Sequence, residues 1–224
     1  MLTACVCLAP AARAGEGVYL TIDGGYQFWS KDSLAQKLPA QVGQQNTSLL
    51  LDDQLPDGGL FALRLGYNIG GHVGFEGSFA IHPWDVLAQT RGAIGFVGLA
   101  TRWFPLQGLI RPNRQADFSL VAGIDYFLHG GNGLKDPNGD GTLPNTGRGM
   151  DGMAVEFGGT FELYPAKSIS LGITPRYYML HPLRYFTDFN NRDKGGQLPL
   201  TGNVGGGIFS ISLSITFHFE PQPD

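Results

Sequence analysis

The sequence predicts an all-β protein, folded as a single antiparallel up-and-down barrel of eight strands. Charged residues make up only 15% of the chain, while it contains 34 glycines and 12% aromatic residues, a mixture that favours strands and turns over helices. In addition, eight segments alternate apolar and polar residues one by one, as a strand with one apolar face does. No change of composition divides the 224 residues, so we expect one domain over residues 15–224, after a short leader.

The longest apolar stretch without a charge, Met1 to Ala12, makes up most of the leader, and it is too short to cross a bilayer as a helix. The leader ends in Ala12-Arg13-Ala14, which places small residues where a signal peptidase requires them. We therefore expect residues 1–14 to be a secretory signal that is removed before Gly15. The basic segment that normally begins such a signal is missing, so we expect translation to start upstream of Met1. The alternative is that the leader forms a buried N-terminal strand.

Both cysteines, Cys5 and Cys7, lie in this leader. A mature chain that begins at Gly15 has no thiol, which excludes cysteine catalysis and cysteine metal sites. Leu2-Thr3-Ala4-Cys5 also resembles the lipobox of a bacterial lipoprotein, in which Cys5 is acylated.

The first three strands follow from clear alternation. Residues 18–28 place Val18 and Ile22 on one face and Asp23 on the other. Residues 61–69 and 73–82 alternate in the same way, and only a short glycine-containing segment separates them, which predicts a tight hairpin turn.

The fourth segment, Gly92 to Phe104, is apolar on both faces. Its composition predicts a strand, but its phase is ambiguous. Arg102 requires a polar environment and is therefore expected on the wet face.

The last four strands are predicted over residues 118–128, 153–163, 169–179 and 208–219. The first two keep their carboxylates on one face, and the last alternates Ser and Thr with Ile, Leu and Phe most regularly. Pro175 cannot donate a hydrogen bond to a ladder, so we expect a bulge or a missing bond in the third of these strands.

The connections between the predicted strands differ greatly in length. Residues 30–57, 129–150 and 181–207 form long connections rich in Gly, Asn, Asp and Pro, whereas the hairpin turn after residue 69 and residues 165–167 are short. The other two connections are a short loop over residues 84–91 and the segment 105–117. Long loops on the outside and short turns on the periplasmic side are the layout of outer-membrane barrels. An even number of strands brings both termini to the periplasmic side.

The polar face indicates which side of the barrel meets lipid. It carries many Gly, Ser, Thr and Ala and almost no Lys, which suits a narrow lumen filled by side chains better than a solvated exterior. We therefore predict a transmembrane barrel with its apolar face in lipid, in which Arg64 and Glu76 pair. The predicted polar network of the lumen consists of Asp23, Arg64, Glu76, Arg102, Asp125, Glu156, Glu162 and Arg176.

Several tyrosines and tryptophans fall near predicted strand ends, where aromatic residues form the two interfacial girdles of a membrane protein. The alternative is that aromatic residues simply favour strands. The predicted girdle consists of Trp29, Trp84, Trp103, Tyr126, Tyr164, Tyr177 and Tyr185.

These features resemble the small outer-membrane β-barrel family that includes the transmembrane domain of outer-membrane protein A and its eight-stranded relatives. The resemblance covers Gly15 to Phe219 and depends on the signal end, the first strand and the last strand with Phe217 and Phe219. It implies a location in the bacterial outer membrane, with membrane lipid and lipopolysaccharide as partners. It also implies a terminal aromatic signal for the barrel-assembly machinery, although here residues 220–224 follow Phe219.

The charges and motifs exclude several functions. A net charge of -4 without a Lys/Arg cluster argues against nucleic acid as a partner. A lipid A deacylase of this architecture has a His-x-Ser pair, and none of the five histidines is followed two residues later by Ser. We therefore predict that the protein is not an enzyme.

The string Asp136-Pro137-Asn138-Gly139-Asp140-Gly141 spaces Asp136, Asn138 and Asp140 as a calcium loop spaces its oxygen ligands. Gly147 occupies the position of the usual acidic twelfth residue, although Asp151 is near, and ordinary turns produce similar strings. An Asx-rich surface loop without a cofactor is the competing interpretation.

The leading hypothesis for function is a structural or surface-interaction protein, a filled barrel that carries long external loops. The surface partner is unknown, although residues 188–193 form a polar loop cluster that could contact one. The alternatives are a narrow pore or hydrophobic-ligand channel for small solutes, and a soluble ligand-binding barrel.

Overall fold

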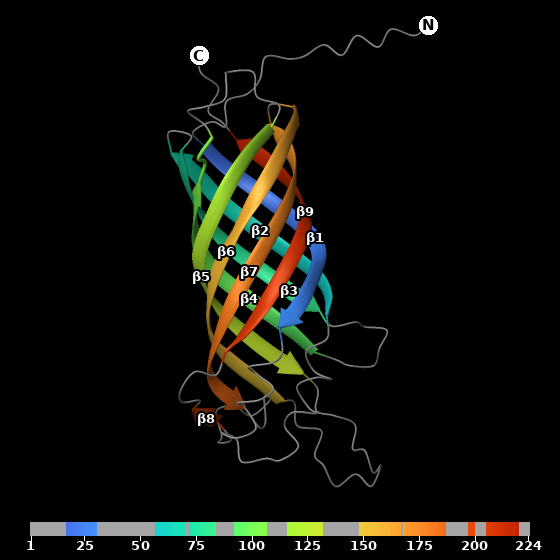
Figure 1. Cartoon of the computed structure of the whole chain (residues 1–224), viewed down its shortest axis with the longest axis vertical. Helices are drawn as coiled ribbons and strands as arrows, with labels where there is room; N and C mark the ends of the chain where they lie inside the picture. The colour runs from blue at the N-terminus through green and yellow to red at the C-terminus, as the bar shows by residue number, and fades with distance from the viewer. Residues whose placement is uncertain are drawn as a thin grey trace, which may run out of the picture.

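A computed structural model of the chain shows a closed barrel of tilted strands (Figure 1). It describes residues 17–30, 57–69, 72–83, 92–106, 116–131, 148–166, 168–186, 197–199 and 205–219. The strands are β1 (Gly17–Ser30), β2 (Gly58–Ile69), β3 (Val73–Pro83), β4 (Gly92–Trp103), β5 (Ala116–Gly131), β6 (Arg148–Ala166), β7 (Ile169–Phe186), β8 (Gln197–Pro199) and β9 (Gly206–Phe219).

Eight of these strands form the barrel wall in chain order. Each strand from β1 to β7 pairs antiparallel with the next, β7 pairs with β9, and β9 pairs with β1 to close the ring. The three-residue β8 adds to the end of β7. The eight-stranded antiparallel up-and-down barrel predicted from the sequence is therefore confirmed, with all eight predicted strands in place.

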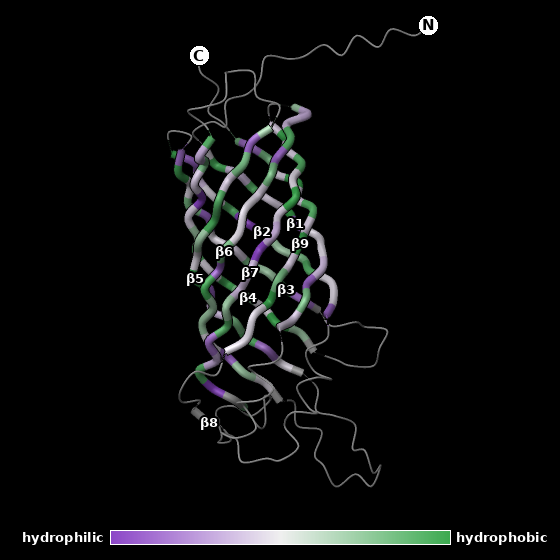
Figure 2. The backbone as a smooth tube through the Cα atoms, in the orientation of Figure 1, coloured by the Kyte–Doolittle hydropathy of each residue, from purple (hydrophilic) through white to green (hydrophobic). Residues whose placement is uncertain are grey.

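Alternation places apolar side chains outside the barrel and polar ones inside. On β2, every second residue from Phe61 to Ile69 is exposed, and the residues between them are buried. On β4, where the sequence left the phase open, Ile94, Phe96 and Arg102 face the lumen and Leu99 faces outward with 75% of its surface exposed. Hydrophilic and hydrophobic stretches are accordingly interspersed along the strands in Figure 2.

The two ends of the barrel differ. We call the end where β1 begins and β9 ends the near end, since Val18 pairs with Phe219 there, and the end that carries β8 the far end. The strands β5, β6 and β7 have 16, 19 and 18 residues, against 11 or 12 in β2 to β4. They extend beyond their neighbours at the far end.

The disruption predicted at Pro175 is a gap in pairing between β6 and β7. Paired residues stop at Gly158 with Arg176 and resume at Phe161 with Ile173, without a change of register. On its other side Pro175 still pairs with Ile211 of β9. Within the described residues no helix is long and apolar enough to cross a membrane.

Candidate functional site in the lumen

Strand parity brings the charged residues of the wall into one space. A strand turns alternate side chains to opposite faces, so Asp23, Arg64, Glu76, Arg102 and Arg176 all point inward, each at most 3% exposed. Asp125, Glu156 and Glu162, the other residues of the predicted network, are 1–2% exposed. The structure thus places all eight of them in the lumen.

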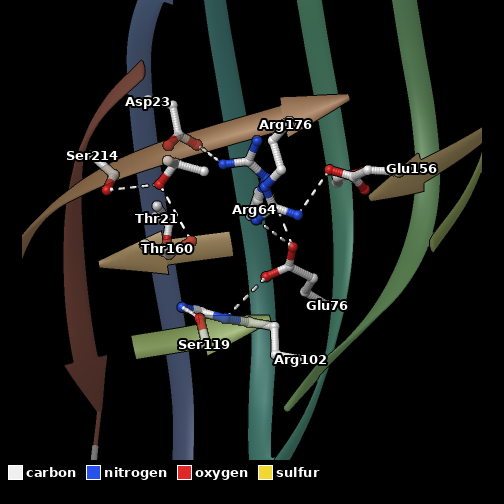
Figure 3. A network of polar contacts seen from close by, with 12 residues as sticks. Thr21, Asp23, Arg64, Glu76, Arg102, Ser119, Glu156, Thr160, Arg176 and Ser214 are labelled. Atoms are coloured by element: carbon white, nitrogen blue, oxygen red, sulfur yellow. Dashed lines mark hydrogen bonds and ion pairs between the residues drawn. The ribbon is translucent and has the colours of Figure 1, made fainter. Parts of the chain in front are cut away.

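Glu76 lies at the centre of an ionic network, among three guanidinium groups contributed by three different strands (Figure 3). Its Oε1 accepts a hydrogen bond from Arg176 Nη2 at 3.2 Å and lies 3.8 Å from Arg64 Nε. Its Oε2 lies 3.8 Å from Arg102 Nε and accepts from Tyr19 Oη at 2.9 Å. The contact between β7 and β3 crosses the lumen, because β4, β5 and β6 separate these strands in the wall.

Each of the three arginines also has a second carboxylate. Arg64 pairs with Asp23, Arg176 Nη1 donates to Glu156 Oε1 at 2.8 Å, and Arg102 Nη2 donates to Glu162 Oε2 at 3.2 Å. We use the name ionic network for these seven residues, the three arginines with Asp23, Glu76, Glu156 and Glu162. The expected pair of Arg64 and Glu76 forms, but it is one edge of this larger set, and the contact of Arg64 with Asp23 is closer.

Hydroxyl groups add further hydrogen bonds to the network, although the Nε atoms of its three arginines have no hydrogen-bond partner among the described residues. Glu162 accepts from Ser170 at 3.1 Å and Thr216 at 3.3 Å through Oε1, and Ser119 accepts from Arg102 at 3.0 Å. Sequence reasoning did not single out these side chains or Tyr19. Strand parity could have identified most of them, since Tyr19, Ser119 and Ser170 each lie an even number of residues from a charged lumen residue on the same strand. Thr216 follows from its pairing with Ser170.

Asp125 belongs to the lumen but stands beside the network. Its Oδ1 accepts from Ser78 at 3.2 Å, and its Oδ2 has no hydrogen-bond partner among the described residues. The backbone of Gly98 lies so close to this carboxylate that a Cβ there would overlap it. The Asp125 carboxylate can therefore occupy this place only because residue 98 of the neighbouring strand is glycine.

The far half of the lumen contains a cluster of aromatic and apolar side chains, which the sequence did not reveal. The rings of Phe96 and Tyr178 are tilted against each other with centroids 4.8 Å apart, and the rings of His82 and Phe127 lie 5.3 and 6.1 Å from that of Phe96. These four rings come from β3, β4, β5 and β7, so they form an aromatic layer across the lumen. Leu60, Met150, Leu180 and Ile208 pack into the same buried cluster.

The lumen is filled at both levels. The space enclosed by the three arginines, by Glu76 and Glu162, and by Thr21, Thr160, Thr174 and Thr216 leaves no room for a water-sized sphere. Beyond it, the buried rings of the aromatic layer occupy the lumen. No open path therefore leads through the part of the lumen that these residues line.

The predicted aromatic girdle is only partly on the outer face. Trp103, Tyr126 and Tyr177 are exposed there by 54%, 42% and 41%. Tyr177 lies in the middle of β7 rather than at an end, because that strand continues to Phe186.

Two members of the predicted girdle face the lumen instead. Trp29 packs against the apolar cluster, and Tyr164 Oη donates to Glu162 Oε2 at 3.4 Å. The reason is parity, since Trp29 shares a face with Asp23 and Tyr164 with Glu162. Trp84 and the side chain of Tyr185 lie outside the described residues.

The predicted calcium ligands Asp136, Asn138 and Asp140 also lie outside the described residues. Within the described residues no group of three or more His, Cys, Asp or Glu side chains is arranged to hold a metal ion. Calcium binding therefore stays a prediction.

Comparison with solved structures identifies the architecture. Neisserial surface protein A has a TM-score of 0.54 at 10% identity, with 91% of this chain and 98% of that one covered. OprG of Pseudomonas aeruginosa has a TM-score of 0.53 at 11% identity, covering 93% of this chain and 100% of that one. The chain has the fold of the small outer-membrane β-barrels. The N-terminal β-barrel domain of Pseudomonas aeruginosa OprF, at a TM-score of 0.50, 10% identity and coverage of 92% and 99%, agrees.

Identities this low establish the fold and no more. No protein-family model matches the sequence, and no curated protein matches it.

Proposed function

We propose that the protein spans the outer membrane of a Gram-negative bacterium as a closed, non-conducting barrel with a structural or surface-interaction role. The near end faces the periplasm in this proposal, and the long connections at the far end face outward. The carrying observation is the filled lumen, in which the ionic network and the aromatic layer each close the passage. The apolar outer face supports the membrane location, because exposed side chains such as Leu65 and Leu213 would be costly in water.

The proposal includes no catalytic activity. Ser170 Oγ lies 3.0 Å from His218 Nε2, within the range of a nucleophile and its base. However, Ser170 is fully buried and its hydroxyl donates to Glu162. A serine has one proton to donate, so His218 donates to Ser170 rather than accepting from it, which is the wrong polarity for a nucleophile.

The location is tested by expressing the full gene, separating outer membrane from periplasm, and comparing boiled with unboiled samples on a gel. We expect recovery in the outer membrane with a heat-dependent mobility shift. The mass of the purified protein tests whether residues 1–14 are removed. Recovery as a soluble periplasmic protein would contradict the proposal and favour a ligand-binding barrel.

Conductance in a planar bilayer tests whether the lumen is closed. We expect no steady current from the wild-type barrel. A steady current, or uptake of small solutes by liposomes that contain it, would favour the alternative of a narrow pore or hydrophobic-ligand channel.

A further inference from the structure

One ion pair lies on the outer face of the described strands, where apolar side chains predominate and Thr101 and His181 are among the exposed polar ones. Arg184 near the end of β7 pairs with Asp151 near the beginning of β6, at the far end of the barrel. Asp151 shares the parity of Met153 and Val155, both of which are exposed outward. The pair therefore marks the border of the apolar band.

A β-bulge brings Arg184 to this face. Gly152 pairs with Pro182, whereas Asp151 pairs with Arg184, so Leu183 is an extra residue in β7. Without the bulge, Arg184 would follow Tyr178, Leu180 and Pro182 on the lumen face. With it, Leu183 and Arg184 are exposed in succession, which agrees with the general role of bulges in redirecting a side chain.

The guanidinium is held in a fixed orientation. Its Nε donates to Asp151 Oδ1 at 3.0 Å and its Nη2 donates to Asp151 Oδ2, a bidentate contact. Tyr126 Oη donates to the same Oδ2 at 2.5 Å. Asp151 is 1% exposed, whereas the side chain of Arg184 is 46% exposed. Asp151 contacts one edge of the guanidinium, which carries five N–H donors, and the Cζ atom lies 5.6 Å from the centroid of the Phe186 ring. Nearly half of the side chain remains exposed.

The surroundings combine a cation with flexible apolar side chains. Met179 and Leu183 are 51% and 42% exposed on the same strand, and Met153 is 38% exposed on β6. An oriented guanidinium at the border of an apolar band suits a ligand with a phosphate group and hydrocarbon chains, because arginine binds phosphate through two parallel hydrogen bonds.

We propose that Arg184 binds the phosphate of a lipid in the outer leaflet, and that Met179 and Leu183 contact the hydrocarbon chains of that lipid. This inference rests on the proposed function, which places the far end in the outer leaflet. Asp151 and Tyr126 act as positioning residues, because they fix the guanidinium before the lipid arrives and so lower the cost of ordering it on binding.

The test measures lipid binding to the folded, purified barrel in a neutral, phosphate-free detergent. The probes are diphosphorylated lipid A, lipid A without its phosphates, and inorganic phosphate, and native mass spectrometry reports the dissociation constants. We expect the diphosphorylated form to bind, and Arg184→Gln to weaken it about tenfold or more. Arg184→Lys, which keeps the charge without the fork, should fall between the two.

Thr101→Val is the control, since it removes a hydroxyl group from the outer face at the near end of the barrel and leaves the cluster around Arg184 unchanged. We expect a change of less than about twofold in lipid A binding, well below the loss for Arg184→Gln. Equal lipid A binding by wild type and Arg184→Gln would overturn the inference, as would equal binding of the phosphate-free lipid. Binding of inorganic phosphate alone with the same affinity would make the site a general anion site instead.

Failure of this inference and failure of the proposed function give different results. If Arg184→Gln binds lipid A normally but is recovered in the outer membrane with a heat-dependent shift, only the lipid site is wrong. If the wild-type protein is recovered in the periplasm, the proposed function is wrong.

Discussion

At the residue scale, the narrow lumen depends on glycine residues at positions where two strands approach each other closely. Gly25 faces the lumen and lies against the backbone of Ile211 and Ser212, so a Cβ there would overlap main-chain atoms that cannot move aside. Its neighbour Gly24 faces outward with nothing within 4 Å of such a Cβ. We expect Gly25→Ala to destabilise the barrel by about 1–3 kcal/mol, measured by urea unfolding in lipid vesicles.

Gly24→Ala is the control for this prediction, because it makes the same chemical change one residue away in open space. Its effect should stay within about 0.5 kcal/mol. Equal effects of the two substitutions would mean that the close approach of β1 and β9 does not limit the side chain at position 25.

Glu76 is the second position at which we expect a single substitution to lower the stability of the barrel strongly. Glu76→Gln removes a charge that faces three arginines, and we expect a loss of about 3 kcal/mol, as for breaking a buried ion pair. Glu156→Gln should cost less, because Arg176 keeps its contact with Glu76. Thermal unfolding of both variants in detergent tests this order. A larger loss for Glu156→Gln would contradict the central position of Glu76.

At the element scale, the gap at Pro175 predicts a local weakness in the wall. Pro175→Val supplies the missing N–H between β6 and β7, so we expect slower amide exchange at Gly159 and Thr160 and a gain of about 1 kcal/mol. Ile173→Val is the control, since position 173 is already paired with both neighbouring strands. Unchanged exchange at Gly159 and Thr160 would show that the gap has another cause.

The strands themselves could be predicted from sequence because alternation records which face is buried. Parity also assigned Asp23, Arg64 and Glu76 to the lumen. Alternation does not record height along the barrel, so it could not separate the ionic network from the aromatic layer around Phe96. Nor does it register the extra residue Leu183, which reverses the parity of β7 and moves Arg184 to the outer face. The errors at Trp29 and Tyr164 arose from judging aromatic residues by closeness to a strand end rather than by parity.

At the scale of the whole molecule, two different kinds of side-chain interaction fill the lumen, one in each half of the barrel. The near half uses charged groups whose carboxylates and guanidiniums pair with one another, and the far half uses packed aromatic rings. A buried ionic group costs several kcal/mol to desolvate, which the network offsets only while its partners remain in place. Loss of one closure therefore leaves the other intact, so a single substitution such as Glu76→Gln should not by itself produce steady conductance.

Substitutions on the outer face of the barrel test whether that face meets lipid or water. Leu213 lies in the middle of β9 with 70% of its surface exposed. In a membrane, Leu213→Arg should destabilise the barrel by about 2–4 kcal/mol, whereas Ile69→Arg at the near end should cost about 0–1 kcal/mol. In water, both substitutions replace an exposed apolar side chain with a charged one and should be nearly neutral. Unfolding of both variants in lipid vesicles measures this difference, and equal small effects would mean that the outer face does not lie in a bilayer.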